Sequence, residues 1–219
     1  MKYNLKTLMK SPLFQDISEN DMEAMLCCLG ATERKYRKNE VILLAGTKVS
    51  SVGILTEGNA QITRDDAEGN RTILSELEQA DLFAEAYVAA GYAEIPVTVI
   101  ATSDCRIVWI SFDKIIGTCS SSCDFHNTLV QNMMRVIAIK NIFMNEKMRI
   151  LSCKTTKEKL ITYLNDYSER VGNDKFKIPF SRTELADFLS VDRSAMSREL
   201  SRLRDEGYIR YNKNEFELL

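Results

Sequence analysis

The chain has 219 residues, and its 29 Lys and Arg against 31 Asp and Glu give a formal net charge of −2. This balance excludes a uniformly basic protein that would attract nucleic acid over its whole surface. No apolar run approaches the length of a membrane-spanning helix, so we expect no membrane partner. The N-terminus lacks the apolar core of a signal peptide, and the six cysteines are therefore expected to be reduced thiols in the cytoplasm.

The first half of the chain carries the signals of a β-rich domain. Residues 18–29 predict a short amphipathic helix with acidic residues in its first turn. From about Ala31 to Phe112, short β-rich segments alternate with turn signals, which indicates a small antiparallel barrel or roll. Residues 68–70 predict a hairpin turn between two such segments. Four glycines are expected to be turn residues of this domain: Gly46, Gly53, Gly58 and Gly69.

After Phe112 the apolar residues recur at the spacing of an α-helix. The stretch from Asp113 to about Leu151 has no proline, and we predict one long helix there. A second copy of the helix would cover the part of its apolar stripe that the roll leaves open. This favours a homodimer with parallel helices, the alternative being a helix that packs only within its own chain. Residues 152–155 are expected to be a hinge.

A capping box marks the start of a helix-turn-helix candidate. Ser181 and Glu184 have the capping-box spacing and open a short helix of apolar periodicity. Asp192 can cap a second helix that runs to about Glu206, and Gly207 lies where a left-handed residue commonly follows a helix.

The segments on both sides of this motif predict a winged-helix domain. Upstream, Thr155 or Thr156 caps a helix that ends before Gly172, and residues 175–180 predict a strand. Downstream, residues 208–218 alternate in polarity and predict a β-hairpin wing.

The second helix of the motif has one apolar side and one polar side. Met196, Leu200 and Leu203 share the side that would pack on the first helix. The opposite side predicts DNA contacts, because serine can bind phosphates or base edges and arginine can bind O6 and N7 of guanine together. An ordinary solvent-exposed face is the alternative. The predicted DNA-binding residues are Arg193, Ser194, Ser197, Arg198, Ser201 and Arg202.

The charge of this region limits how it can bind DNA. Residues 154–219 hold 13 Lys and Arg against 12 Asp and Glu, a net charge of +1. Any DNA site is therefore a local patch with few phosphate contacts per subunit. Such a patch favours a dimer that binds the two half-sites of a palindromic operator.

Several short sequence motifs occur in the C-terminal region and in the predicted roll. The C-terminal ones are Ser181-Arg182-x-Glu184-Leu185-Ala186, Val191-x-Arg193, Ser197-Arg198, Leu203 and Glu206-Gly207-x-Ile209. In the roll, Ala80-Asp81-Leu82-Phe83-Ala84-Glu85 looks like a Gly-Asp-x-Phe-Gly-Glu segment. With these motifs, the chain resembles the Crp/Fnr superfamily of bacterial transcription regulators. The resemblance implies an α+β fold with three parts: an antiparallel β-roll or jelly-roll sensor domain (residues 1–112), a dimerisation helix with its hinge (113–153) and a winged helix-turn-helix DNA-binding domain (154–219). It also implies RNA polymerase as a further partner.

The resemblance bears on the signal that the roll would sense. The family's cyclic-nucleotide members hold the ribose and the cyclic phosphate with Gly-Glu and, further along, Arg-Ser-Ala. Glu85 is present here, but Ala84 precedes it and the Arg-Ser pair is replaced within residues 95–98. A buried phosphate without its guanidinium loses a charge-assisted contact, so we expect cyclic AMP not to bind. We expect an unidentified small-molecule effector near Phe83, Glu85, Val97 and Thr98.

The recognition helix departs from the family at one position. Arg198 matches the family's guanine-reading arginine, whereas Ser194 stands where many members carry a glutamate that accepts from cytosine N4. We therefore predict an operator that keeps the guanine read by Arg198 and changes or relaxes the base pair at Ser194.

Redox and haem sensing are alternatives within the same fold. The oxygen-sensing members hold an iron–sulfur cluster with three cysteines before the roll, whereas this chain has only the adjacent Cys27 and Cys28 there, so no cluster is expected. Cys119 and Cys123 could share a helix face in a redox or metal sensor, and otherwise they pack as small apolar thiols. His126 is the only histidine and could bind haem, although a lone histidine is more often structural.

An enzyme is disfavoured, and no catalytic or metal-binding residues are expected. One histidine cannot supply a Ser/His/Asp set for acyl transfer, and no phosphate loop or His-Glu-x-x-His motif is present. A ligand-binding module that does not bind DNA stays an alternative. These motifs do not distinguish an activator from a repressor.

Overall fold

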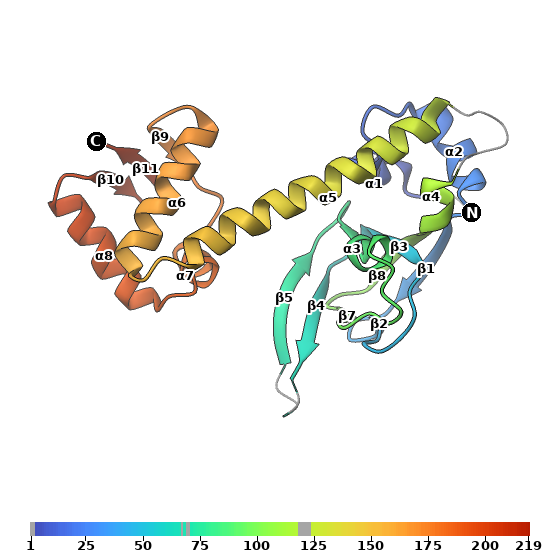
Figure 1. The fold of residues 1–219 in the computed structure, drawn as a ribbon, viewed down its shortest axis with the longest axis horizontal. Helices are drawn as coiled ribbons and strands as arrows, with labels where there is room; N and C mark the ends of the chain where they lie inside the picture. Colours follow the sequence, from blue (N-terminus) through green and yellow to red (C-terminus); the bar gives the residue numbers. More distant parts are fainter. Residues whose placement is uncertain (1–2, 67, 69–70, 118–123) are drawn as a thin grey trace. The chain divides into compact units, whose positions relative to one another are not determined.

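The computed structural model describes residues 3–66, 68, 71–117 and 124–219. The chain forms two compact units, residues 1–139 (unit 1) and residues 140–219 (unit 2). The division falls inside the long helix, whereas the sequence suggested a separate central segment at residues 113–153. Figure 1 labels the helices and strands of both units. No helix in the described part of the chain is long and apolar enough to cross a membrane.

Unit 1 is an antiparallel β-roll, as predicted. Its two four-stranded sheets have the strand orders β1-β8-β3-β6 and β2-β7-β4-β5. The short helical segments before them are α1 (Leu5–Leu8), η1 (Pro12–Phe14) and α2 (Glu19–Cys28). The strands are β1 (Thr32–Tyr36), β2 (Val41–Leu43), β3 (Ser51–Glu57), β4 (Ala60–Asp65), β5 (Arg71–Leu77), β6 (Leu82–Phe83), β7 (Thr98–Ala101) and β8 (Cys105–Ser111), with helix α3 (Glu85–Ala89) between β6 and β7.

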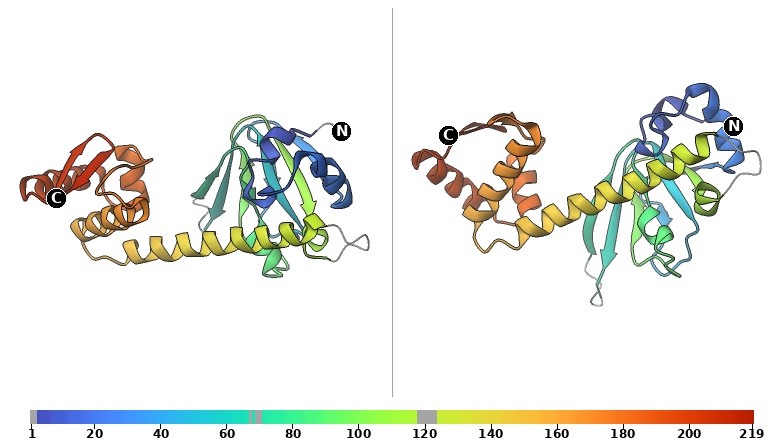
Figure 2. Two further views of the ribbon diagram at one scale, coloured as in Figure 1. Left: turned by 90° about the horizontal axis from the view of Figure 1, so that it is seen from above. Right: turned by 45° about the horizontal axis from the view of Figure 1, so that its top comes forward.

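Strand β3 is buried on both faces and separates two apolar cores. Val52 and Ile54 belong to a core shared with the N-terminal helices and the first half of the long helix. Figure 2 shows these helices beside the sheets. Leu55 points the other way, into the core between the two sheets. This alternation follows from the two-residue period of a strand. It explains why the centre of β3, residues 52–55, is entirely apolar.

Gly53 was expected in a turn, and this expectation was wrong. It lies in the middle of β3 and pairs with Phe83 of β6. A Cβ atom at this position would lie 2.3 Å from Cζ of the Phe83 ring, so only glycine lets the ring lie against the strand. Gly46 and Gly58 do occupy bends with positive φ, at 82° and 79°. Gly69 lies outside the described residues.

The predicted long helix is interrupted near its start. Helix α4 (Phe112–Ile116) ends at Gly117, whose backbone is extended, and α5 (Asp124–Leu151) is described from Asp124 onward. The Gly117 amide donates to the Asp113 carbonyl at 2.8 Å, and a Cβ atom at Gly117 would lie 2.6 Å from that oxygen. Glycine thus allows the tight end of α4. Cys119 and Cys123, the proposed redox pair, lie outside the described residues.

Helix α5 contributes to the core of each unit. Leu129, Met133 and Val136 are buried in unit 1 against the β1-β8-β3-β6 sheet. Ile150 is buried in the core of unit 2. Residues 152–155 then connect α5 to α6 (Thr156–Val171).

Unit 2 is a winged helix-turn-helix, as predicted. Its two motif helices are α7 (Arg182–Leu189) and α8 (Arg193–Asp205), and its three-stranded sheet has the order β10-β11-β9. The strands are β9 (Lys175–Lys177), β10 (Ile209–Asn212) and β11 (Glu215–Leu218). Met196, Leu200 and Leu203 are buried in one core, which confirms the apolar side expected for α8.

Candidate nucleic-acid interface

Local hydrogen bonds fix the helix-turn-helix. The Ser181 hydroxyl accepts from the Glu184 amide at 3.3 Å, and the Glu184 carboxylate accepts from the Ser181 amide at 2.6 Å, which is the predicted capping box. Hydrogen bonds from the Ser181 amide and hydroxyl lower the pKa of Glu184. Ser190 ends α7 with φ of 51°, and this left-handed residue allows the short turn into α8.

The far end of α8 has the geometry expected from Gly207. This residue has φ of 74°, and its amide donates to the Arg204 carbonyl at 3.0 Å. The next amide, of Tyr208, donates to the Leu203 carbonyl at 2.9 Å. These two bonds form a Schellman motif, which ends the helix and directs the chain into the wing.

Asp192 caps α8 and holds Ser194. Its carboxylate accepts from the Ala195 amide at 2.8 Å and from the Ser194 hydroxyl. These hydrogen bonds, with that of Ser194 the larger cause, lower the pKa of Asp192. Because the Ser194 proton is donated to Asp192, the oxygen of this exposed side chain is left to act as an acceptor.

Five of the six predicted DNA-binding side chains are exposed. These are Arg193, Ser194, Ser197, Arg198 and Arg202. The sixth, Ser201, is half-buried at the edge of this surface. Its hydroxyl donates to the Ser197 carbonyl at 3.2 Å and lies 3.5 Å from the Tyr211 hydroxyl of the wing. Periodicity alone had placed it with the others, since the wing that covers it is distant in sequence.

Arg198 and Arg202 differ in their partners. Arg202 donates to the Glu199 carboxylate at 2.9 Å, one helical turn away. Among the described residues, Arg198 forms no hydrogen bond or ion pair, and its charge helps to lower the pKa of Asp192. The Arg198 guanidinium can therefore reach a ligand without breaking a hydrogen bond in the free protein.

The start of α6 borders the same surface, which the sequence did not reveal. Thr155, Thr156 and Lys157 line an open cleft of about 360 Å³ together with Arg198 and Arg202. At this helix start the Glu158 carboxylate already accepts from the Lys154 and Thr155 amides. The groups of the cleft that favour an anion such as a phosphate are therefore its cationic side chains, Lys157, Arg198 and Arg202. The predicted Thr155 cap marked the start of this helix, but only the fold places it beside α8.

Arg182 belongs to the resemblance motif but faces the wing. Its guanidinium lies 4.7 Å from the ring centroid of Tyr211 and 5.1 Å from that of Phe216. Burial lowers the pKa of this arginine. Arg182 therefore packs α7 onto the wing sheet through cation–π contacts.

The four residues predicted for the effector lie together in the roll, but they are core residues. Phe83, Glu85, Val97 and Thr98 are 1%, 4%, 2% and 7% exposed. The Phe83 ring packs edge-on against Trp109 at 5.4 Å. The Thr98 hydroxyl accepts from the Ala45 amide at 3.2 Å. A molecule that used these side chains would have to enter the core between the two sheets.

The segment before Glu85 keeps a particular backbone conformation. Ala80 and Ala84 have φ of 76° and 67°, values that favour glycine. These are the two positions at which the family's Gly-Asp-x-Phe-Gly-Glu segment has glycine. The chain thus preserves the turn although it has replaced both glycines.

The haem and metal alternatives gain no support from the geometry. The His126 ring lies in the first turn of α5, and its Nε2 is 3.0 Å from the Lys114 carbonyl oxygen, so this nitrogen already has a hydrogen-bond partner. Within the described ranges, no group of three or more His, Cys, Asp or Glu residues could hold a metal ion. Burial raises the pKa of the Cys105 thiol to about 11, which makes it a poor nucleophile.

A β-roll sensor domain followed by a long helix and a winged helix-turn-helix defines a DNA-binding transcription regulator. The model of the cyclic nucleotide-binding domain matches residues 33–122, and that of the Crp-like helix-turn-helix domain matches residues 158–219. With both domains in this order, the chain belongs to the Crp/Fnr superfamily.

Curated and solved relatives agree with this assignment. The transcriptional activator protein FnrL of Cereibacter sphaeroides is 22% identical over 191 residues, which cover 80% of this chain and 71% of FnrL. The cAMP-activated global transcriptional regulator CRP of Salmonella typhimurium is 21% identical over 175 residues, covering 80% and 83%. The structure of CprK complexed with OCPA covers 90% of this chain and 88% of CprK, with 14% identity and a TM-score of 0.64. The structural likeness shows the fold alone.

Proposed function

We propose that this protein is a dimeric, sequence-specific regulator whose affinity for a palindromic operator responds to a small molecule sensed in the β-roll. The observation that carries the proposal is the exposed face of α8. There Arg198, which forms no hydrogen bond or ion pair among the described residues, adjoins a cleft that the first residues of α6 also line. An arginine that can read a base edge and a cleft lined by cationic side chains match the two kinds of contact that a duplex offers, base edges and phosphates.

Within this proposal, Arg198 reads guanine and Ser194 reads the neighbouring base pair. The Ser194 oxygen can accept but not donate while its proton is bound to Asp192. Cytosine N4 and adenine N6 are the donors that the major groove presents. Ser194 therefore favours cytosine or adenine, and it discriminates less strongly than the glutamate found in many family members, because a neutral acceptor forms the weaker bond.

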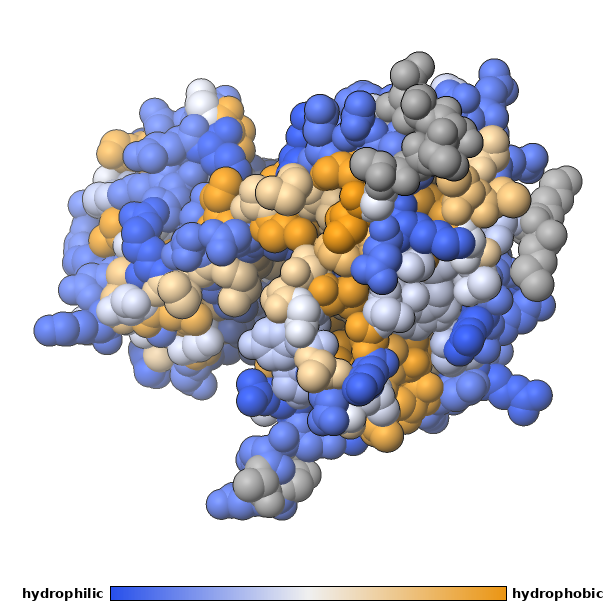
Figure 3. Space-filling model, turned by 45° about the vertical axis from the view of Figure 1, so that its right-hand side comes forward, coloured by the Kyte–Doolittle hydropathy of each residue, from blue (hydrophilic) through white to orange (hydrophobic). Residues whose placement is uncertain are grey.

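Helix α5 provides the surface for a dimer. Its exposed residues include one row in which intervals of four and three residues alternate, as in a coiled-coil seam. This row has seven residues and none of them is charged, although 27% of the residues in the chain are Asp, Glu, Lys or Arg. Figure 3 shows hydrophobic side chains gathered on one face of the molecule, and large exposed ones on α5 include Met134 at 65% and Met148 at 58%. The seam residues are Asn127, Gln131, Met134, Ala138, Asn141, Asn145 and Met148.

The effector of this proposal is not cyclic AMP. Glu85 is retained at the start of α3, but the arginine that would neutralise the cyclic phosphate is absent from residues 95–98. Proteins similar to this chain differ in their ligands, since CRP is named as cAMP-activated and CprK was solved with OCPA. The side chains inside each roll, more than the fold, would therefore determine which ligand it binds. Mass spectrometry of small molecules that co-purify with the native protein identifies it.

The decisive test is selection of DNA ligands from a random duplex pool by the full-length protein. We expect a two-fold symmetric site with a guanine in each half and a cytosine or adenine preference beside it. A control selection with Arg198→Ala should lose the guanine and keep the symmetry. Recovery of no symmetric site, or of the same site by both proteins, would contradict the proposal.

A further inference from the structure

The connection between α5 and α6 is short, and its backbone is hydrogen-bonded throughout. Its four residues, 152–155, are those that the sequence predicted to be a hinge. The Ser152 amide donates to the Met148 carbonyl at 2.9 Å, and the Cys153 amide donates to the Ile150 carbonyl at 3.1 Å. The first half of the connection is therefore bonded to the last turn of α5.

The second half of the connection is held by the first turn of α6. The Glu158 carboxylate accepts from the Lys154 amide at 2.9 Å and from the Thr155 amide at 3.1 Å. The Thr155 hydroxyl accepts in return from the Glu158 amide at 3.1 Å, which completes a capping box. All four amides of the connection thus have acceptors within the chain. A hinge absorbs large changes of its backbone dihedral angles, and such changes would break these bonds.

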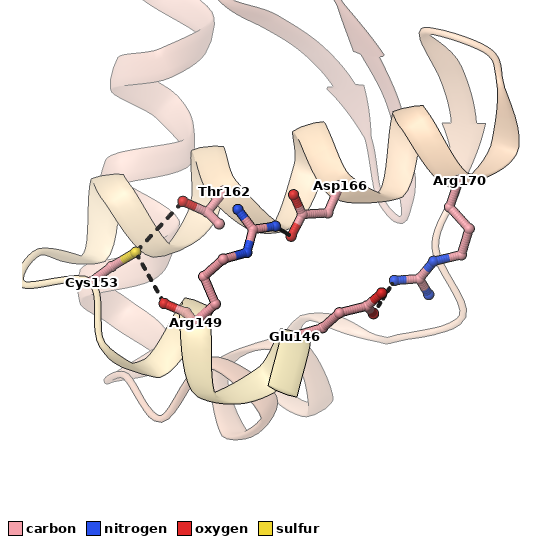
Figure 4. A network of polar contacts seen from close by, with 6 residues as sticks. All are labelled: Glu146, Arg149, Cys153, Thr162, Asp166 and Arg170. Carbon is pink, nitrogen blue, oxygen red and sulfur yellow. Dashed lines mark hydrogen bonds and ion pairs between the residues drawn. The ribbon is translucent and has the colours of Figure 1, made fainter. Parts of the chain in front are cut away.

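Side chains also join the last turns of α5 to α6. Glu146 pairs with Arg170 at 2.8 Å, and Arg149 pairs with Asp166 (Figure 4). Exposed ion pairs of this kind contribute little individually. They act together with Ile150, which is 3% exposed in the core that α6 shares with the helix-turn-helix. The end of α5 is therefore held to α6 by a buried apolar side chain as well as by charges.

Helix α6 is in turn bound to both helices of the motif. The Lys159 ammonium group donates to the carbonyl of Leu189, the last residue of α7, at 3.0 Å. Lys157 pairs with Glu206, which follows α8 directly, at 2.6 Å. Leu160 of α6 is fully buried in the core that the two motif helices share. Contacts therefore run without a break from the end of α5 through α6 to α7 and α8.

We propose that the last turns of α5, residues 152–155 and α6 form one rigid arm, so that α5 moves the helix-turn-helix with it. The seam proposed for the dimer includes Asn145 and Met148, which lie on this arm. A signal from the roll then repositions the two α8 helices through the paired α5 helices, without bending at residues 152–155. This role in the dimer rests on the proposed function, whereas the rigidity of the connection does not.

Amide hydrogen exchange of the full-length protein, resolved to single residues, tests the rigidity without DNA. The amides of residues 152–155 should exchange at least about a hundredfold more slowly than in an unstructured peptide. Glu158→Ala removes two acceptors, so it should speed exchange at Lys154 and Thr155 about tenfold and leave the other two amides unchanged. Asp187→Ala, at an exposed carboxylate of α7, is the matched control and should change none of them. Unprotected amides throughout the connection of the parent protein would overturn the proposal.

The spacing of the operator half-sites tests the role of the arm in the dimer. Binding would be measured on the selected operator and on one with two base pairs added between its halves, which turns one half-site by roughly 70°. With rigid arms, the parent protein should bind the wider operator about a hundredfold more weakly. Thr155→Gly combined with Glu158→Ala removes the capping box, and this variant should lose only about tenfold. Thermal unfolding confirms that the variant is folded.

The two experiments separate the rigid arm from the proposed function. Equal losses of the parent protein and the variant on the wider operator would overturn the role of the arm in the dimer. If selection recovers no symmetric site, the proposed function fails, and hydrogen exchange alone decides whether the connection is rigid.

Discussion

Replacing Arg198 by alanine is the sharpest perturbation of the proposed DNA surface. In the described structure Arg198 is exposed and forms no hydrogen bond or ion pair, and its charge contributes only the smallest of the effects that lower the pKa of Asp192. The loss of affinity on its removal is therefore expected to come mainly from DNA contacts. Arg202→Ala is the comparison, because Arg202 is exposed on the same helix but pairs with Glu199.

The expected magnitude follows from the number of half-sites. One base-reading arginine contributes about 2 kcal/mol, which corresponds to roughly 30-fold in affinity. A dimer on a symmetric operator loses this contribution twice, so Arg198→Ala should weaken binding to that operator about 1,000-fold. On an operator with the guanine changed in one half, it should weaken binding only about 30-fold, because only one guanine contact remains to be lost. Arg202→Ala should weaken all sequences to a similar extent and lower the slope of log affinity against log salt by about 2 per dimer, one phosphate contact in each subunit.

Fluorescence anisotropy measures both effects. Titrations would use the symmetric operator, the same operator with the guanine changed in one half, and an unrelated duplex, at salt concentrations between about 50 and 200 mM. Arg204→Ala is the matched control, since Arg204 pairs with the adjacent Asp205 in the last turn of α8. If Arg198→Ala lowers the affinity for every duplex equally and reduces the salt slope, Arg198 contacts a phosphate and the assignment of base reading is refuted.

Three further predictions follow from single positions. Ala138→Arg should convert the dimer to a monomer in light scattering, because two added charges meet at the seam, whereas Ile139→Arg at the next exposed position should leave a dimer. If both variants stay dimeric, the seam is refuted. Gly53→Ala should lower the free energy of unfolding by about 2 kcal/mol through its clash with Phe83, and Phe83→Leu should remove most of that added cost; purely additive losses in urea would contradict the contact. The pKa of Asp192 is lowered from 3.8, so its stabilising effect is complete above that pH and is lost as pH falls through the folded value. Asp192→Asn keeps a cap without this titration, and urea midpoints should therefore depend less on acid pH than in the parent protein; an unchanged dependence would assign the effect to other groups.

The helix-turn-helix was predictable because its signals are local. Ser181, Glu184 and Asp192 form caps with amides only two or three residues away, and Gly207 takes its conformation from its own lack of a side chain. None of these contacts requires knowledge of the rest of the fold. The prediction therefore matched the structure to within a residue at both helices.

The errors lie where a distant segment decides the outcome. Gly53 is in a strand because Phe83, thirty residues later, lies against it. Ser201 has the periodicity of an exposed residue, but Tyr211 of the wing covers it. Strand β1, with the polar sequence TERKY, pairs with β8 and had no apolar pattern to reveal it.

The turn before Glu85 shows what the sensor domain has kept and what it has lost. Ala80 and Ala84 hold left-handed backbone conformations at a cost of roughly 1–2 kcal/mol per residue, relative to ordinary conformations. A chain under no constraint at this loop would relax it. The turn leads directly into Glu85, which begins α3 and is 4% exposed. The guanidinium that would pair with a cyclic phosphate is nevertheless absent from residues 95–98. The roll thus combines the turn of the family's Gly-Asp-x-Phe-Gly-Glu segment with the absence of that arginine. We therefore expect the proposed effector to be recognised by chemistry other than a phosphate held by arginine.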